Sequence, residues 1–86
     1  MKVLMKPIQV YALWKEDGGI VPLAFCLEND DEKYKYTVDQ ISCFHEDRFR
    51  GRRVVYFECL IFDGYRQRTV LLWYDIIHHC WYLYKA

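Results

Sequence analysis

The sequence predicts an all-β fold, a small antiparallel barrel or strongly curved meander of about six strands in a single domain, residues 1–86. Short runs rich in β-branched and aromatic residues recur along the chain at near-regular spacing, and turn residues separate them. Both observations are typical of antiparallel sheets. Because a flat meander would leave one apolar face in water, closure into a barrel is favoured.

The first two strands are expected over residues 7–14 and 20–27, after a short frayed lead over residues 1–6. Residues 15–19 join them and end in two glycines that can adopt positive φ. Pro22 cannot donate a ladder hydrogen bond, which places it near a strand start or at an edge. In the first strand, one phase holds Ile8, Val10, Ala12 and Trp14, and the other holds Gln9, Tyr11 and Leu13. In the second strand, Leu23, Phe25 and Leu27 form the apolar phase.

A third strand is expected over residues 33–38, where Tyr and Val alternate with Lys and Thr. Beyond Val38 the apolar phase changes, because Ile41 and Cys43 fall in the opposite phase. A β-bulge or a strand bend accounts for such a change, and small barrels use bulges to turn a corner. The strand is expected to continue toward His45 before a charged connection that ends at residue 53.

The strongest local signal is a β-hairpin around Asp63-Gly64. Asp-Gly between two β-prone runs is typical of a two-residue type I′ turn, in which both central residues need positive φ. With that turn, Phe62 pairs with Tyr65, and one face of the hairpin carries the core side chains. These are Val55, Phe57, Cys59, Ile61, Val70 and Leu72. The opposite face, with Trp73 at its far end, is expected to be partly covered.

A short link over residues 75–79 and a last strand over residues 80–84 complete the chain. The apolar phases together predict one core, whose members include Phe25, Tyr36, Phe57, Val70 and Trp81. Aromatic residues make up 19% of the sequence, more aromatic surface than a small core can easily hide. Part of it is therefore expected in a groove or a self-association surface.

The composition narrows the classes of partner. Twelve basic and twelve acidic side chains give a formal net charge of zero. This balance argues against a dominant electrostatic attraction to nucleic acid or anionic lipid. No apolar run approaches the roughly 18 residues of a membrane span, and the first residues lack the apolar core of a signal peptide. We therefore expect a cytoplasmic protein without membrane contact.

No catalytic or metal-binding set can be assembled at a credible spacing. The four cysteines are Cys26, Cys43, Cys59 and Cys80. Because no two of them form a C-x-x-C pair, we expect reduced, mostly buried thiols. His78 and His79 precede Cys80, but adjacent residues of an extended strand point to opposite faces and cannot all share one metal ion. The sequence therefore predicts a non-enzymatic protein with no cofactor and no bound metal.

Arginine and aromatic side chains form the candidate partner-binding surface. They are Arg50, Arg52, Arg53, Arg66, Arg68, Tyr56, Tyr65 and Trp73. The arginines fall into two basic spots at opposite ends of one hairpin. The alternative interpretation is that they form ion pairs with the acidic residues of segments 28–32 and 46–47. Because Tyr, Trp and Arg are enriched at interfaces, we expect a small adaptor module that contacts a protein partner or a second copy of itself.

Short anchors are spread over nearly the whole chain. They are Pro7-Ile8-Gln9-Val10, Pro22-Leu23-Ala24-Phe25, Tyr36-Thr37-Val38-Asp39-Gln40-Ile41, Asp75 and Trp81-Tyr82-Leu83. With the late hairpin, this order resembles a family of small bacterial all-β domains of unknown function. The resemblance implies no catalytic residue. Similar domains are sometimes encoded beside repair polymerases. The resemblance therefore implies an alternative function, single-stranded nucleic-acid binding in a DNA-repair setting. Arg and Tyr side chains are suited to that function.

Overall fold

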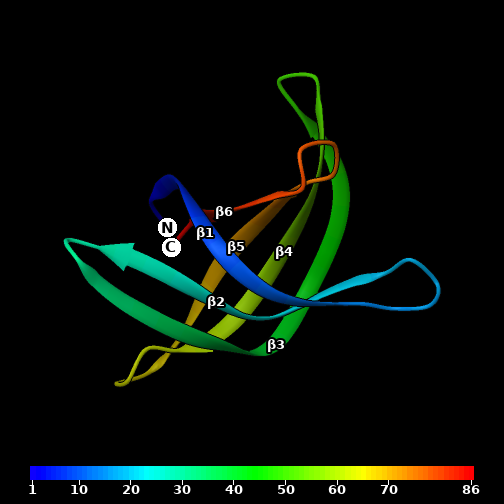
Figure 1. The fold of residues 1–86 in the computed structure, drawn as a ribbon. Helices are drawn as coiled ribbons and strands as arrows, with labels where there is room; N and C mark the ends of the chain where they lie inside the picture. Colours follow the sequence, from blue (N-terminus) through cyan, green and yellow to red (C-terminus); the bar gives the residue numbers. More distant parts are fainter.

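The computed structural model describes all 86 residues, Met1–Ala86, as one antiparallel barrel (Figure 1). Its strands are β1 (Val3–Trp14), β2 (Ile20–Asn29), β3 (Glu32–Phe49), β4 (Arg52–Phe62), β5 (Gln67–Asp75) and β6 (Cys80–Lys85). Each strand pairs with the next, and β6 pairs back onto β1. The predicted all-β class and the six-stranded barrel are confirmed. The protein has no helix of the length and apolarity needed to cross a membrane.

The two ends of the chain close the barrel, and Figure 1 shows them side by side. Val3 pairs with Lys85, and Lys6 pairs with Leu83. The N–H groups of residues 2 and 86 donate to each other's carbonyl groups at 2.8 and 3.1 Å. The expectation of a frayed lead is therefore wrong. Main-chain pairing with β6 orders this segment without requiring an apolar alternation in its side chains.

Two bulges allow β3, which is 18 residues long, to turn a corner of the barrel. Its register with β4 shifts between Val38 and Gln40 and again between Ile41 and Cys43. Each shift inserts one extra residue, so the inward positions of this segment fall three residues apart, at Val38, Ile41 and Phe44. The change of phase predicted after Val38 is confirmed.

A bulge in β2 corrects the inward phase expected for that strand. Pairing with β1 shifts after Tyr11, which leaves Leu23 as the extra residue. Leu23 is therefore exposed, whereas Pro22 is buried and Ile20 packs against the core. Pro22 lies where β2 has no β3 partner, because that pairing begins only at Ala24. Its missing N–H therefore costs no ladder hydrogen bond on that side.

The β4–β5 hairpin has the expected faces but a longer turn. Phe62 pairs with Gln67 rather than with Tyr65, and the Asp63 N–H donates to the Arg66 carbonyl oxygen at 3.1 Å. The Asp63 carboxylate also accepts hydrogen bonds from the N–H groups of Tyr65 and Arg66, at 2.9 and 3.0 Å, which stabilises the longer turn. The register differs from the expected one by two residues, a shift that keeps every side chain on its face.

The charged connection expected over residues 45–53 is in fact a second hairpin. β3 extends to Phe49, and β4 begins at Arg52. Arg50 and Gly51 form the turn with φ values of 50° and 79°, the two positive values of a type I′ turn. The tip projects beyond the barrel wall (Figure 1), so its strands lack the alternation that a buried face produces.

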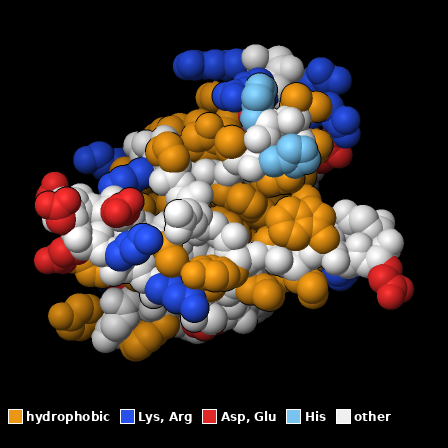
Figure 2. Space-filling view, in the orientation of Figure 1, with side chains coloured by type: hydrophobic (Ala, Val, Ile, Leu, Met, Phe, Trp, Pro, Cys, Tyr) orange, Lys and Arg blue, Asp and Glu red, His pale blue; other side chains and the backbone are white.

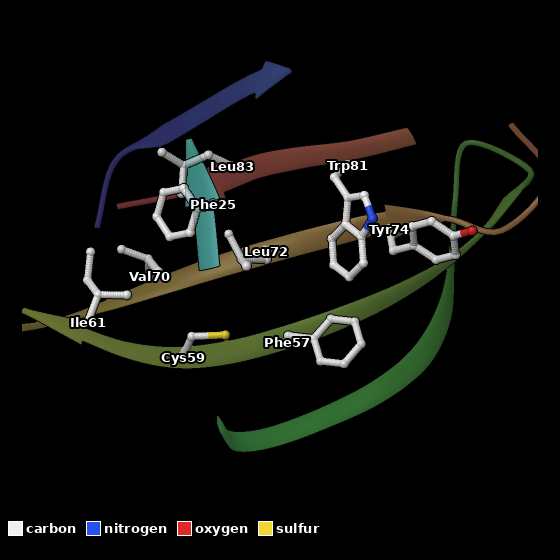
Figure 3. Packing of buried hydrophobic residues seen from close by; sticks show 9 residues of the cluster. All are labelled: Phe25, Phe57, Cys59, Ile61, Val70, Leu72, Tyr74, Trp81 and Leu83. Carbon is white, nitrogen blue, oxygen red and sulfur yellow. The ribbon is translucent and has the colours of Figure 1, made fainter. Parts of the chain in front are cut away.

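Inward side chains of the strands form one core (Figure 3). Its buried members are Phe25, Phe57, Cys59, Ile61, Val70, Leu72, Tyr74, Trp81 and Leu83. The predicted core is confirmed: four of its named residues are in this cluster, and Tyr36 packs against it while partly buried. In Figure 3 three of the aromatic members, Phe57, Tyr74 and Trp81, gather at one end of the cluster, and Phe25 lies at the other end.

The four cysteines are unpaired but not mostly buried. Only Cys59 is buried, Cys26 is half-buried, and Cys43 and Cys80 are exposed. The expectation of mostly buried thiols is wrong for the last two. Cys43 follows the second bulge of β3 and falls on the outward phase, and Cys80 begins β6 directly after a turn.

A second aromatic cluster, here called the outer cluster, lies on the outside of the barrel wall. It consists of Phe49, Tyr56, Trp73, Tyr82 and Tyr84. Phe49 packs edge-to-face on Trp73 with 5.4 Å between ring centroids, and Trp73 is fully buried although it points outward. Part of the excess aromatic surface is thus packed within the molecule, and the hairpin face that carries Trp73 is covered as expected.

Candidate functional site

The structure places the predicted partner-binding residues in two separate regions. The first, near the β3–β4 tip, contains Arg50, Arg52, Arg53, Tyr56 and Trp73. The second, at the β4–β5 turn, contains Tyr65, Arg66 and Arg68. Strand β4 runs from one region to the other, so the two basic spots stay apart (Figure 1). Trp73 offers no surface to a partner, because Phe49 covers it.

Two arginines of the tip are engaged with carboxylates of the protein itself. Nη2 of Arg52 lies 3.0 Å from Oδ2 of the fully buried Asp75. Arg53 donates from Nε and Nη2 to Oε1 of Glu46, at 2.9 and 2.6 Å. Arg50 has no carboxylate within ion-pair distance. Much of the basic character of the tip is therefore neutralised locally.

Asp75 links the tip to the β5–β6 turn. Its Oδ1 accepts hydrogen bonds from the N–H groups of Ile77 and His78 at 3.0 Å, and its Oδ2 lies 3.0 Å from Nδ1 of His78. Burial by itself raises the pKa of Asp75, but the hydrogen bonds from His78 and the charge of Arg52 outweigh it and hold the pKa below its ordinary value. Asp75 is thus a satisfied anchor within the fold.

An apolar groove at one end of the barrel is the strongest candidate site, and sequence reasoning did not locate it. Its larger part, here called the aromatic cavity, has a volume of about 430 Å³. Hydrophobic residues from the strands around the opening dominate its lining: Trp14, Ile20, Phe44, Val55, Phe57, Tyr74 and Ile76. Figure 2 shows hydrophobic side chains exposed between the histidines and the β1–β2 turn.

A second cavity of about 390 Å³ continues the groove between β2 and β3. The two cavities share Gly19, Ile20, Phe44 and Phe57 in their walls, and together they are called the mouth groove below. The groove exists because β2–β3 pairing ends at Ala24 and Thr37. Residues 20–23 of β2 and residues 39–49 of β3 therefore leave their facing main-chain edges unpaired.

Exposed aromatic rings rest on buried ones along the aromatic cavity. Trp14 is 56% exposed and Phe44 is 70% exposed. Phe44 stacks on the buried Phe57 at 6.0 Å between ring centroids, and Trp14 packs edge-to-face with Tyr74 at 6.4 Å. In the sequence, Trp14 shares one phase of the first strand with Ile8, Val10 and Ala12, and no local signal distinguishes a core ring from a ring at an open rim.

Three polar side chains also line the aromatic cavity, together with Gly18 and Gly19: His45, Glu46 and His79. Nδ1 of His79 lies 2.7 Å from the Tyr74 hydroxyl. Burial, with the nearby Asp75 and Cys80, raises the pKa of Tyr74, so this hydroxyl stays protonated at neutral pH. No group of three or more His, Cys, Asp or Glu side chains lies close enough to hold a metal ion. The cavity can bind an apolar group, or a group that packs against aromatic rings, and orient it through a few polar contacts.

Comparison of the chain with protein-family models, with curated proteins and with solved structures finds no match.

Proposed function

We propose that this protein is a non-enzymatic binding module that contacts a protein partner and receives an extended partner segment in the mouth groove. The observation that carries the proposal is the pair of exposed rings, Trp14 and Phe44, held in place by buried rings. Contiguous exposed apolar surface marks interaction sites, and large aromatic side chains dominate the binding energy of interfaces. The proposal keeps the expected class of partner and moves the contact surface from the arginines to the groove.

The unpaired strand edges support an extended partner segment. A peptide that adds to a sheet edge gains main-chain hydrogen bonds and places alternate side chains in adjacent pockets. Pro22 in β2 has no N–H to offer, whereas residues 40–46 of β3 contain no proline. The β3 edge is therefore the better template, and Phe44 lies within it.

Selection from a displayed library of random ten-residue peptides tests this proposal. We expect enriched peptides with apolar residues at alternate positions, and we expect their binding to be lost in a Trp14→Ser/Phe44→Ser variant. Both side chains are exposed, so the variant should keep its fold. Phe62→Ser is the matched control, because Phe62 is equally apolar and 54% exposed beside the β4–β5 turn, outside the groove. No enrichment, or equal binding to the groove variant, would contradict the proposal.

Single-stranded nucleic acid is the second candidate ligand. Arg48 and Arg50 have no carboxylate within ion-pair distance, and His45 stacks on Tyr56 near them with 5.0 Å between ring centroids. Charged side chains beside aromatic faces are the combination used by single-strand binders.

Titration of labelled single-stranded DNA and RNA decides between the two candidates. The measurement compares low and physiological salt and uses Arg48→Glu/Arg50→Glu, which spares the ion-paired Arg52 and Arg53. Our proposal predicts no salt-dependent micromolar binding. Binding that weakens with salt and disappears in the variant would replace the protein-contact proposal.

A further inference from the structure

We infer that the aromatic cavity recognises an alkylammonium group, the side chain of a lysine or methylated lysine on the partner segment. This inference deepens the proposed function and rests on it. Among the residues that line the cavity, Glu46 is the one carboxylate, and none is Lys or Arg. Four aromatic rings share the same walls: Trp14, Phe44, Phe57 and Tyr74. Both the carboxylate and the electron-rich ring faces favour a cation over an anion.

The rings come from four strands that the fold brings to one opening. Trp14 ends β1, Phe44 and Phe57 are register partners on β3 and β4, and Tyr74 lies on β5. The planes of Trp14 and Tyr74 are 77° apart, so the two rings form differently oriented walls. A cation within about 6 Å of ring centroids is attracted by each face that it meets. Tyr74 is buried in the core and Trp14 is exposed, so the site is fixed at its base and open at its rim.

Glu46 has one oxygen available to such a cation. Its Oε1 accepts both hydrogen bonds from Arg53, and its Oε2 accepts none. The Glu46 side chain is half exposed, which places the charge at the rim, where an ammonium head can stay partly hydrated. A neutral apolar side chain would gain nothing from this oxygen, and a carboxylate would be repelled by it. Arg53 does not line the cavity, although its bond to Glu46 weakens the attraction.

Three small probes, each with the same hydroxyethyl group, distinguish the effect of charge on binding from the effect of shape. Choline carries a quaternary ammonium, ethanolamine carries a primary ammonium, and 3,3-dimethyl-1-butanol is the neutral isostere of choline. Titrations at pH 8, where ordinary imidazoles are neutral, follow the indole N–H resonance of Trp14 and the amide resonances of residues 44–46. We expect choline or ethanolamine to bind about fivefold or more tightly than the neutral isostere. The tighter of the two shows whether the methylated or the unmethylated group fits.

Two variants that break the same ion pair provide the sharpest test. Glu46→Gln removes the carboxylate and should weaken ammonium binding by about threefold, whereas Arg53→Gln frees both oxygens of Glu46 and should strengthen it by a similar factor. The pair is about half exposed, so neither change should alter the fold. Trp14→Leu keeps an apolar rim without the ring and should reduce the preference for the cation, whereas Phe62→Leu, outside the cavity, should change nothing.

The inference would be overturned if neither choline nor ethanolamine bound more tightly than the neutral isostere, or if Glu46→Gln and Arg53→Gln changed ammonium binding in the same direction. These failures are distinguishable from failure of the proposed function. Library peptides that require Trp14 and Phe44 but carry no lysine would leave the groove as a protein-binding site and overturn only its cation preference.

Discussion

Phe44 and Phe57 show at the residue scale that position in the barrel, not residue type, decides the role of an aromatic side chain. They are register partners on β3 and β4 and stack on each other. Phe57 is 1% exposed and Phe44 is 70% exposed. One ring therefore contributes mainly to stability, and the other is available for binding.

Alanine substitution of the two rings should separate these roles. Phe57→Ala should lower the free energy of unfolding by roughly 3–5 kcal/mol, because it removes a buried ring and leaves a cavity. That loss is enough to unfold much of a domain this small. Phe44→Ala should cost less than about 1 kcal/mol, since its ring is mostly in water. Thermal unfolding of both variants measures the two losses of stability. Similar melting temperatures would show that the faces of β4 are misassigned.

Thiol reactivity gives a second residue-scale prediction. Cys59 should resist iodoacetamide in the folded protein, because burial raises its pKa to about 12 and excludes the reagent. Cys43 and Cys80 are exposed and should be labelled. The hydrogen bond from the Cys43 thiol to Glu58 raises the pKa of Cys43, so Glu58→Gln should accelerate labelling of Cys43 and leave Cys80 unchanged. Peptide mass spectrometry at successive times measures the extent of labelling of each cysteine. Fast labelling of Cys59 in the folded protein would contradict its burial in the core.

The lowered pKa of Asp75 predicts how the stability of the protein depends on pH. Its pKa is held below the ordinary value, so its contribution is fully present above the unfolded-state pKa of about 4 and is lost as pH falls through the lower folded-state pKa. Asp75→Asn should therefore destabilise by about 1.5–3 kcal/mol at pH 7, where charged hydrogen bonds are lost.

The comparison of wild type and variant isolates this residue, because the other titrating groups are common to both proteins. Urea unfolding at a series of pH values should show a difference in stability that shrinks below about pH 4. A difference that stays constant down to pH 2 would mean that the carboxylate charge does not stabilise the fold.

At the scale of elements, the turns set the register. Gly64 has φ +98°, a region that a β-branched residue resists. Gly64→Val should lower the free energy of unfolding by about 1 kcal/mol or more. Tyr65→Val is the control in the same turn, because Tyr65 is 94% exposed and does not adopt positive φ. Equal stability of the two variants would show that the turn conformation is wrong.

The bulges explain where sequence analysis of the strands succeeded and where it failed. Regular alternation predicted the inward faces of β4, β5 and β6. The register shift between β5 and β6 leaves Tyr84 as the extra residue, beyond the core residues Trp81 and Leu83 of β6, so it does not change the inward phase. The change of phase after Val38 was visible because apolar residues flank it. The bulge at Leu23 was not visible, since Leu23 itself is apolar and fits the expected alternation. The Arg50-Gly51 turn was missed because solvated strands flank it.

At the scale of the whole molecule, the groove exists because two neighbouring strands of the closed barrel pair along only part of their length. β2 and β3 pair at one end and diverge at the other, and the rings of Trp14 and Phe44 are exposed at the opening. The sequence could predict that some aromatic surface lies in a groove, because it contains more rings than a small core can hide. It could not predict which rings, since that depends on where two strands separate. The arginines, by contrast, stand out in the sequence, but Arg52 and Arg53 pair with carboxylates of the protein itself near the tip.

The most direct test of a partner segment in the mouth groove is a map of amide shifts on binding. ¹⁵N-labelled protein is titrated with the most enriched library peptide. We expect the large shifts in residues 13–21, 40–46 and 74–79, and unchanged resonances in the acidic turn 28–32 and the β4–β5 turn 63–68. Large shifts at residues 48–53 or 63–68, with the groove unchanged, would contradict the account and return the contact surface to the arginines.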